Sequence, residues 1–258
     1  MSHSASLARM RSLGLSLAAM LTVMASTGAA RAGEVRIAVA ANFTAAAKEI
    51  GALFEQRTGH KAVFSSGSTG QLYHQIAQGA PFEVYLAADR ARPLKAVDDG
   101  LAVPGSLFTY ATGRLVLFSR DKALVKGAAT LKQGRFAHIA LANPATAPYG
   151  AAAIRVMRAL GVHDALAPKV VRGNNIAQAY QFVATGNAEL GFVAASQVAR
   201  HGGGSRWIVP DRLYPVIAQG GVLLKRSGKN AAARAFVAFL RGPQARAVKL
   251  RYGYGAGD

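Results

Sequence analysis

Short apolar runs rich in β-branched residues alternate with amphipathic segments along most of this chain. The first run, residues 35–39, is followed at once by apolar residues at helical spacing from Phe43 to Phe54. Further expected strands cover residues 62–64, 82–87, 114–118, 139–142, 170–172 and 190–193, and further expected helices cover 72–77, 151–160, 176–185, 195–200, 231–240 and 244–251. Strands alternating with helices of this length predict an α/β fold with mainly parallel sheets, covered by helices on both faces.

Two extended passages, near residues 110 and 217, interrupt this alternation. We interpret them as crossovers between two α/β lobes. The expected first lobe combines residues 33–112 with 217–258, and the expected second lobe covers 113–216.

The N-terminal segment has the pattern of a secretory signal. Arg9 and Arg11 precede an apolar run that begins at Leu13, and small residues lead to Ala32. This predicts a signal peptide over residues 1–32, cleaved after Ala32, and hence a periplasmic protein. The alternative is a membrane anchor, but the uncharged stretch is near the lower limit of about 18 residues for a span, and its small-residue exit favours cleavage. The absence of cysteine excludes disulfide bonds and a lipid anchor at the cleavage site.

The charge of the chain describes its surface more than its fold. There are 31 Lys and Arg residues against 12 Asp and Glu. Removal of residues 1–32 takes three arginines and no acid, which leaves 28 basic residues and a net charge of about +16. Because these residues are dispersed rather than gathered in runs, we interpret them as a solvated surface that attracts anions.

Candidate chemistry lies where four expected strands meet the helices that follow them. Neutral residues mark these turns: Asn42, Ser68 with Thr69, Tyr149, and an asparagine pair before Ile176. Asn42 suits the N-cap of its helix, where a short polar side chain accepts a backbone N–H. Each turn alone is an ordinary helix cap. Together, at the carboxyl edge of parallel strands, they predict a donor-rich pocket for an anion.

Such a pocket suits a fully ionised tetrahedral dianion, because all the oxygens of that ion accept hydrogen bonds. A protonated phosphate would need an acceptor for its own hydrogen, and a pocket made of donors leaves that group unpaired.

Several segments resemble a known family when they are taken together. They are VAANFT (39–44), SSGSTG (65–70), GAPFEV (79–84), AD (88–89), ANP with APYG (142–144 and 147–150), LGFVA (190–194) and FLRGPQA (239–245). In this order they are similar to the molybdate-binding proteins of bacterial ABC importers. The resemblance covers essentially the whole chain after the expected signal peptide.

The resemblance implies a type II periplasmic binding fold with two lobes and a ligand, molybdate or tungstate, in the cleft between them. It also implies delivery of the ligand to a membrane permease and an ATPase by a monomeric protein. Carried over residue by residue, the expected ligand groups are the backbone of Ala41, the amide of Asn42, Thr69 with Ser68 beside it, and the backbones of Tyr149 and Ile176. Some family members have a tyrosine where this chain has Ala194, so no hydroxyl is expected there.

Three alternatives to this function differ in how well the sequence supports them. An enzyme is not expected, because the chain has no P-loop, no G-x-S-x-G turn and no H-E-x-x-H helix, and its histidines are scattered. We therefore expect no catalytic residue, no cofactor and no direct metal ligand. The GSTG segment (67–70) superficially matches a G-x-x-G loop that clamps nucleic acid, but aromatic residues are not interleaved with basic ones. Sulfate or another tetrahedral oxyanion is the closer alternative, which the size of the cavity decides.

Overall fold

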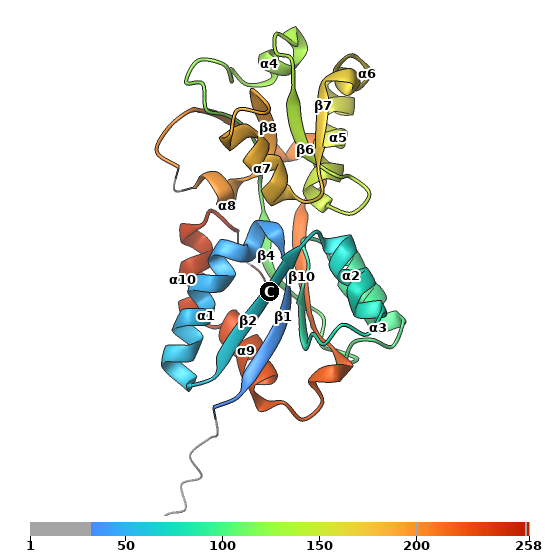
Figure 1. Cartoon of the computed structure of the whole chain (residues 1–258), viewed down its shortest axis with the longest axis vertical. Helices are drawn as coiled ribbons and strands as arrows, with labels where there is room; N and C mark the ends of the chain where they lie inside the picture. The colour runs from blue at the N-terminus through green and yellow to red at the C-terminus, as the bar shows by residue number, and fades with distance from the viewer. Residues whose placement is uncertain (1–31, 200, 256, 258) are drawn as a thin grey trace, which may run out of the picture. The chain divides into compact units, whose positions relative to one another are not determined.

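The computed structural model describes residues 32–199, 201–255 and 257. The expected signal peptide, apart from Ala32, lies outside the described residues. Two five-stranded sheets organise the described chain, and the first lies in the lower part of Figure 1. Its strand order is β2 (Lys61–Gly67), β1 (Glu34–Ala40), β3 (Val84–Leu86), β10 (Ile217–Leu223) and β4 (Phe108–Gly113).

The second sheet has the same number of strands and a related order. It runs β7 (Val170–Gly173), β6 (Ile139–Ala142), β8 (Leu190–Ala194), β5 (Leu115–Ser119) and β9 (Ser205–Ile208). The chain passes from the first sheet to the second between β4 and β5, and returns between β9 and β10. The lobe boundaries expected from the sequence stay a prediction.

Both sheets are mainly parallel, as the sequence predicts, because four of the five strands in each run in the same direction and one strand is reversed. In the first sheet β1 pairs in parallel with β2 and β3, whereas β10 runs antiparallel to β3 and β4. In the second sheet β6 pairs in parallel with β7 and β8, whereas β5 runs antiparallel to β8 and β9. The antiparallel pairs form at β10 and β5, the strands that follow each passage between the sheets. The alternation of strands and helices in the sequence does not reveal this reversal of direction.

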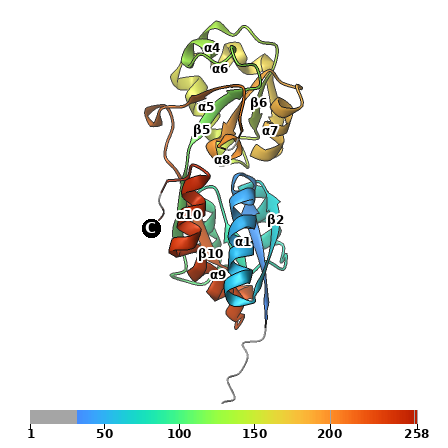
Figure 2. The same cartoon turned by 90° about the vertical axis from the view of Figure 1, so that its left-hand side faces the viewer.

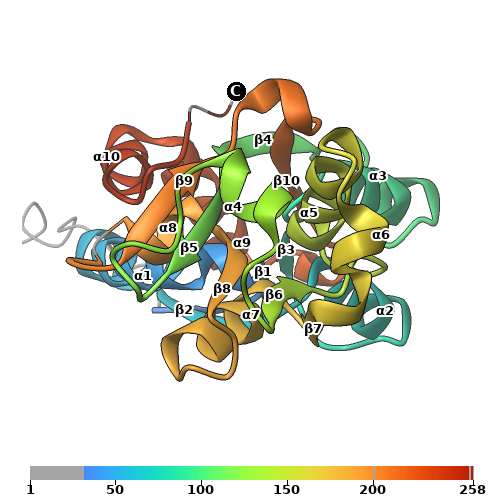
Figure 3. The same cartoon turned by 90° about the horizontal axis from the view of Figure 1, so that it is seen from above.

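Helices cover both faces of the first sheet. On one face lie α1 (Thr44–Thr58), α9 (Ala231–Arg241) and α10 (Pro243–Arg251), as Figure 2 shows. On the other lie α2 (Thr69–Ala77) and α3 (Ala91–Asp98), as Figure 3 shows. Successive side chains of β1 face opposite ways: Ile37 and Val39 pack with the first group, and Ala38 packs with the second. Burial on both faces explains the continuous apolar run that marks β1 in the sequence.

The second sheet is covered mainly by α5 (Pro148–Ala159) and α7 (Ile176–Ala184), which contact β6 and β8. Shorter elements complete the described fold: η1 (Ala41–Phe43), α4 (Ala128–Gln133), α6 (His163–Leu166), η2 (Ala167–Lys169), α8 (Ala195–Val198), η3 (Asp211–Leu213) and η4 (Lys225–Ser227). Strand β9 and helix α4 are not expected from the sequence. The four residues of β9 form an edge strand of alternating exposure, which is too short to give a periodic signal.

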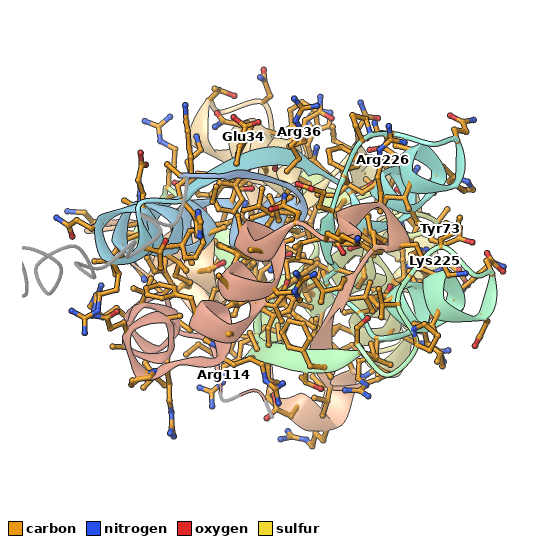
Figure 4. All side chains as sticks on the ribbon, turned by 90° about the horizontal axis from the view of Figure 1, so that it is seen from below. Glu34, Arg36, Tyr73, Arg114, Lys225 and Arg226 are labelled. Carbon is orange, nitrogen blue, oxygen red and sulfur yellow. The ribbon has the colours of Figure 1, made fainter. Side chains whose placement is uncertain are left out.

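Two surface properties follow from the described residues. None of the helices in the described part of the chain has both the length and the apolar character needed to cross a membrane. On the face that Figure 4 shows, Arg36 and Arg226 line one hollow together with Glu34, and Arg114 lies away from them.

Candidate functional site

A small cavity lies where the loops of the two sheets meet. Its walls are Ala40, Ala41, Asn42, Gly67, Ser68, Thr69, Ala88, Ala147, Pro148, Tyr149, Asn175 and Ile176. All six residues that the sequence predicts for the site are among them. The first seven wall residues belong to the chain that builds the first sheet, and the other five to the chain that builds the second. The structure therefore brings four separate strand-to-helix turns to one place.

Three helices of nine residues or more begin at this cavity. They are α2 at Thr69, α5 at Pro148 and α7 at Ile176. The first N–H groups of a helix have no acceptor within the helix, and the helix dipole makes this end positive. Several helix starts around one cavity therefore direct partial positive charge into it without any charged side chain.

The capping bonds identify which backbone donors stay available. In α7, Asn175 Oδ1 accepts the N–H groups of Ala177 (2.9 Å) and Gln178 (3.0 Å), which leaves the N–H of Ile176 without an acceptor in the helix. In α5, the first position is proline and has no N–H. The N–H of Tyr149 is therefore the first donor of that helix. These are the two backbone donors that the sequence predicts on the second sheet.

A glycine allows α5 to start so close to the sheet. A Cβ added to Gly150 would lie 2.1 Å from the carbonyl oxygen of Ala142, at the end of β6. No side chain fits in that space. The position of the Tyr149 N–H in the cavity wall therefore depends on a residue without a side chain.

Thr69 and Ser68 use their hydroxyl groups differently. Thr69 is 1% exposed, and its Oγ1 accepts the N–H of Ala88 at 2.9 Å. Its own hydrogen is therefore left to donate toward the cavity. The Ser68 hydroxyl instead donates to Gln71 Oε1 at 2.9 Å and accepts the Gln71 N–H at 3.4 Å. Ser68 caps α2, so its hydrogen is already used within the helix.

The prediction that Asn42 is a helix N-cap is wrong. Asn42 lies inside the 3₁₀ turn η1, whose N-cap is Ala40, and its side chain caps neither η1 nor α1. The reason is tertiary: the amide Nδ2 donates to Gln219 Oε1 at 2.9 Å and to the hydroxyl of Tyr254 at 3.2 Å. Both hydrogens of this nitrogen are thus given to protein acceptors.

The cavity is neutral and small. None of its wall residues is Lys, Arg, His, Asp or Glu. Its volume is about 10 Å³, close to the 10–15 Å³ that about one water molecule requires. The cavity therefore excludes an organic ligand of ordinary size. Among the residues that the structure describes, no cluster of three or more His, Asp or Glu side chains could hold a metal ion.

The comparison with known protein families agrees with this architecture. Residues 35–255 match the family described as bacterial extracellular solute-binding protein. The chain belongs to this family.

Two relatives of this solute-binding protein are more than half identical to it in sequence. The molybdate-binding protein ModA of Rhodobacter capsulatus is 55% identical over 236 residues, which cover 92% of this chain and 94% of that protein. ModA of Azotobacter vinelandii is 54% identical over 231 residues, which cover 88% and 92% of the two chains. The solved structure of an Azotobacter vinelandii periplasmic molybdate-binding protein superposes with a TM-score of 0.83 at 38% identity, covering 86% of this chain and 98% of that one. These findings confirm the predicted family and the two-sheet α/β fold.

Sequence reasoning missed a buried polar network beside the cavity. Gln219 of β10 is fully buried, and its Oε1 lies 2.9 Å from both Asn42 Nδ2 and the hydroxyl of Tyr110. Its Nε2 donates to the hydroxyl of Tyr149 at 3.3 Å. Burial raises the pKa of Tyr110, Tyr149 and Tyr254 above the usual tyrosine value, so all three hydroxyls are protonated at neutral pH. The only signal in the sequence is one glutamine in an apolar strand.

Direct hydrogen bonds join the two sides of the cavity. The Gly70 N–H donates to the carbonyl of Thr146 at 2.8 Å, and Arg92 Nη2 donates to the carbonyl of Ala145 at 2.9 Å. Ser196 Oγ donates to the carbonyl of Asn42 at 2.9 Å. Loops of the two sheets are thus in contact around the cavity.

Proposed function

We propose that this solute-binding protein captures molybdate in the cavity between its two sheets. The observation that carries the proposal is the composition of the wall: it offers hydrogen-bond donors from three helix starts and the Thr69 hydroxyl, and it holds no charged side chain. The names of its relatives in Rhodobacter and Azotobacter support the same ligand. The proposed ligand groups are those predicted from the sequence: Ala41, Asn42, Thr69, Tyr149 and Ile176, with Ser68 beside Thr69 in the wall of the cavity.

A tetrahedral dianion fits this wall better than a protonated anion. The N–H groups of Tyr149 and Ile176 and the hydroxyl of Thr69 all donate, which suits an anion whose oxygens all accept hydrogen bonds. Asn175 Oδ1, an acceptor at the wall, already receives two backbone N–H groups. Asn175 Oδ1 is therefore not available to accept a hydrogen carried by phosphate. Sulfate is the alternative with the same charge and shape, and tungstate is expected to bind like molybdate.

The proposed role is delivery without chemistry. The dispersed basic surface raises the local concentration of anions, the two lobes close over the dianion, and the closed form docks on the permease and ATPase of an importer. We propose that the protein acts as a monomer in the periplasm after cleavage following Ala32, with lobes formed by residues 33–112 with 217–258 and by 113–216. It has no proposed enzymatic activity, no cofactor and no nucleic-acid partner.

Calorimetric titration of the chain from Gly33 onward tests this proposal. We expect one-to-one binding of molybdate and tungstate at physiological salt, and weak or absent binding of sulfate and phosphate. Sulfate binding as tight as molybdate binding would show that the ligand is wrong. Binding that collapses steeply as salt is raised would favour a polyanion surface instead, because a buried ion is only weakly screened.

A further inference from the structure

Gln219 connects the cavity wall to the strand that returns from the second sheet. It lies in β10, at an irregularity of the pairing with β4 between Gln219 and Gly220. The space around it is full: a Cβ on Gly113 would lie 2.6 Å from Gln219 Nε2 and 2.0 Å from the Tyr149 hydroxyl. The amide of Gln219 is therefore held in one place, with Asn42 on one side and Tyr149 on the other.

The orientation of the Asn42 amide decides what the cavity wall presents. When Nδ2 points to Gln219 and Tyr254, the oxygen Oδ1 is the remaining polar atom. Oδ1 has no hydrogen-bond partner among the described residues, and Asn42 lines the cavity, from which we infer that Oδ1 faces it. In this setting the wall presents an acceptor, which would repel an oxyanion.

The two amides can be turned over together at the loss of one hydrogen bond within the protein, the bond from Asn42 Nδ2 to the Tyr254 hydroxyl. An amide has the same shape with its oxygen and nitrogen exchanged, and only the hydrogen-bond network distinguishes the two settings. After the exchange, Gln219 Nε2 would donate across the 2.9 Å contacts to Asn42 and to the Tyr110 hydroxyl. The Tyr110 hydroxyl would donate to the carbonyl of Ala87, 3.0 Å away.

The remaining partners also accommodate the exchange. The Tyr149 hydroxyl would donate across its 3.3 Å contact to Gln219 Oε1. The hydroxyl of Tyr254 keeps its bond to the backbone carbonyl of Asn42 at 2.7 Å. Asn42 Nδ2 now faces the cavity as a donor, and every other polar atom of the network keeps a partner.

We propose that Gln219 is a positioning residue for the anion site: its amide sets the orientation of the Asn42 amide, and a bound oxyanion selects the setting in which Asn42 donates. This inference rests on the proposed function. It assigns the amide of Asn42 to the ligand. Gln219, which does not line the cavity, acts only by setting the orientation of that amide. The amides of Asn42 and Gln219 make the cavity selective for anions, because only a ligand that accepts hydrogen bonds stabilises the setting in which Asn42 donates.

The variant Gln219→Glu tests the coupling, because an ionised carboxylate only accepts and therefore holds Asn42 Nδ2 away from the cavity. We expect molybdate affinity to fall by about 100-fold at pH 8.5. The loss has two causes: the anion loses its hydrogen bond from the Asn42 amide, and the Asn42 oxygen that faces the cavity repels the anion. As the pH is lowered to 6.5, affinity should recover by up to about tenfold per pH unit, since the carboxyl group introduced in this variant can donate once it is protonated. The matched control is Gln133→Glu, an exposed position on α4. It should bind like the wild type.

The groups around position 219 leave this pH profile interpretable. Tyr110 and Tyr149 contact Gln219, Tyr254 contacts Asn42 beside it, and burial raises the pKa of all three tyrosines well above the range of the titration. Lys249 contacts the carbonyl of Tyr110 and has a pKa lowered to about 8, so the wild type measured over the same range corrects for its titration.

A second variant and a measurement on the wild type complete the test. Gln219→Met keeps the length of the side chain without its polar atoms, and should weaken molybdate binding by about tenfold without pH dependence. In the ¹⁵N-labelled wild type, the side-chain amide signals of Asn42 and Gln219 should both shift on addition of molybdate, more than the exposed Asn187 amide.

The outcomes separate this inference from the proposed function. If the wild type binds molybdate but the amide signals of Asn42 and Gln219 do not shift, the inference is wrong. Loss of affinity in Gln219→Glu that is the same at every pH would also overturn it, since a merely structural defect gives that result. If the wild type binds no molybdate, the proposed function itself fails.

Discussion

Replacing Thr69 by valine removes one hydroxyl from the cavity while keeping the size of the side chain. Oγ1 of Thr69 accepts the Ala88 N–H at 2.9 Å, and its hydrogen is left for the ligand. The variant Thr69→Val therefore removes a donor to the anion and an acceptor for a buried N–H at the same time. Two measurable losses follow, one in affinity and one in stability.

The size of both losses can be set from ordinary hydrogen-bond energies. A hydrogen bond to a charged group contributes about 1.5–3 kcal/mol, so molybdate affinity should fall by about 10- to 150-fold. Ala88 is only 2% exposed, and a buried N–H left without a partner lowers the free energy of unfolding by about 1–3 kcal/mol. Thr69→Ser keeps the hydroxyl and should retain most of the molybdate affinity and most of the stability.

Titration calorimetry with molybdate, together with denaturant unfolding, measures the two losses separately. Thr130→Val is the matched control, because Thr130 is 6% exposed and its Oγ1 accepts the Lys126 N–H at 2.7 Å and donates to the carbonyl of Leu124 at 3.0 Å, away from the cavity. It should lose stability but not affinity. If Thr69→Val loses stability to the same extent and still binds molybdate like the wild type, the assignment of its hydroxyl to the ligand is refuted.

Three further predictions concern the helix start, the contact between the lobes and a buried lysine. Gly150→Ala should lower both stability and molybdate affinity, because its Cβ would lie 2.1 Å from the Ala142 oxygen and displace the start of α5. Arg92→Gln removes the donor to the Ala145 carbonyl, 2.9 Å away, and should speed molybdate release in stopped-flow measurements with little change in the association rate. Burial lowers the pKa of Lys249 to about 8. The unfolded chain then binds more protons above that pH, so the free energy of unfolding should rise between pH 7 and 9.5, by at most about 2 kcal/mol.

Each of these predictions has its own control. Ala153 in the buried face of α5 already has a Cβ, so Ala153→Gly should cost stability through the helix without the affinity loss of Gly150→Ala. An unchanged release rate in Arg92→Gln would contradict a role for that contact in holding the ligand. The rise in stability with pH should vanish in Lys249→Met and persist in Lys132→Met, which removes an exposed lysine. The titration stops at pH 9.5 because tyrosines of the unfolded chain ionise near pH 10.

The parts of the fold that are local in the sequence could be predicted from it. Buried strands such as 139–142 appear as continuous apolar runs, and the polar turns that follow them mark helix starts. That is why Tyr149 and Ile176 could be predicted to lie together at the site: each follows a strand of the same sheet. Strand β9 could not be found, because four edge residues of alternating exposure carry little pattern.

The parts that depend on distant pairing could not be predicted. Asn42 has the side chain of a helix cap, but Gln219, 177 residues further along the chain, takes its amide nitrogen. The antiparallel direction of β10 likewise follows from the route of the chain through the second sheet. Local propensity is overridden in both cases by contacts that only the folded chain forms.

Anomalous diffraction near the molybdenum absorption edge, from crystals grown with molybdate, tests the central claim most directly. We predict one strong molybdenum peak inside the cavity, within hydrogen-bonding reach of its oxygens to the Thr69 hydroxyl and to the N–H groups of Tyr149 and Ile176. Molybdenum found only at surface arginines, with the cavity free of it, would contradict the proposed site.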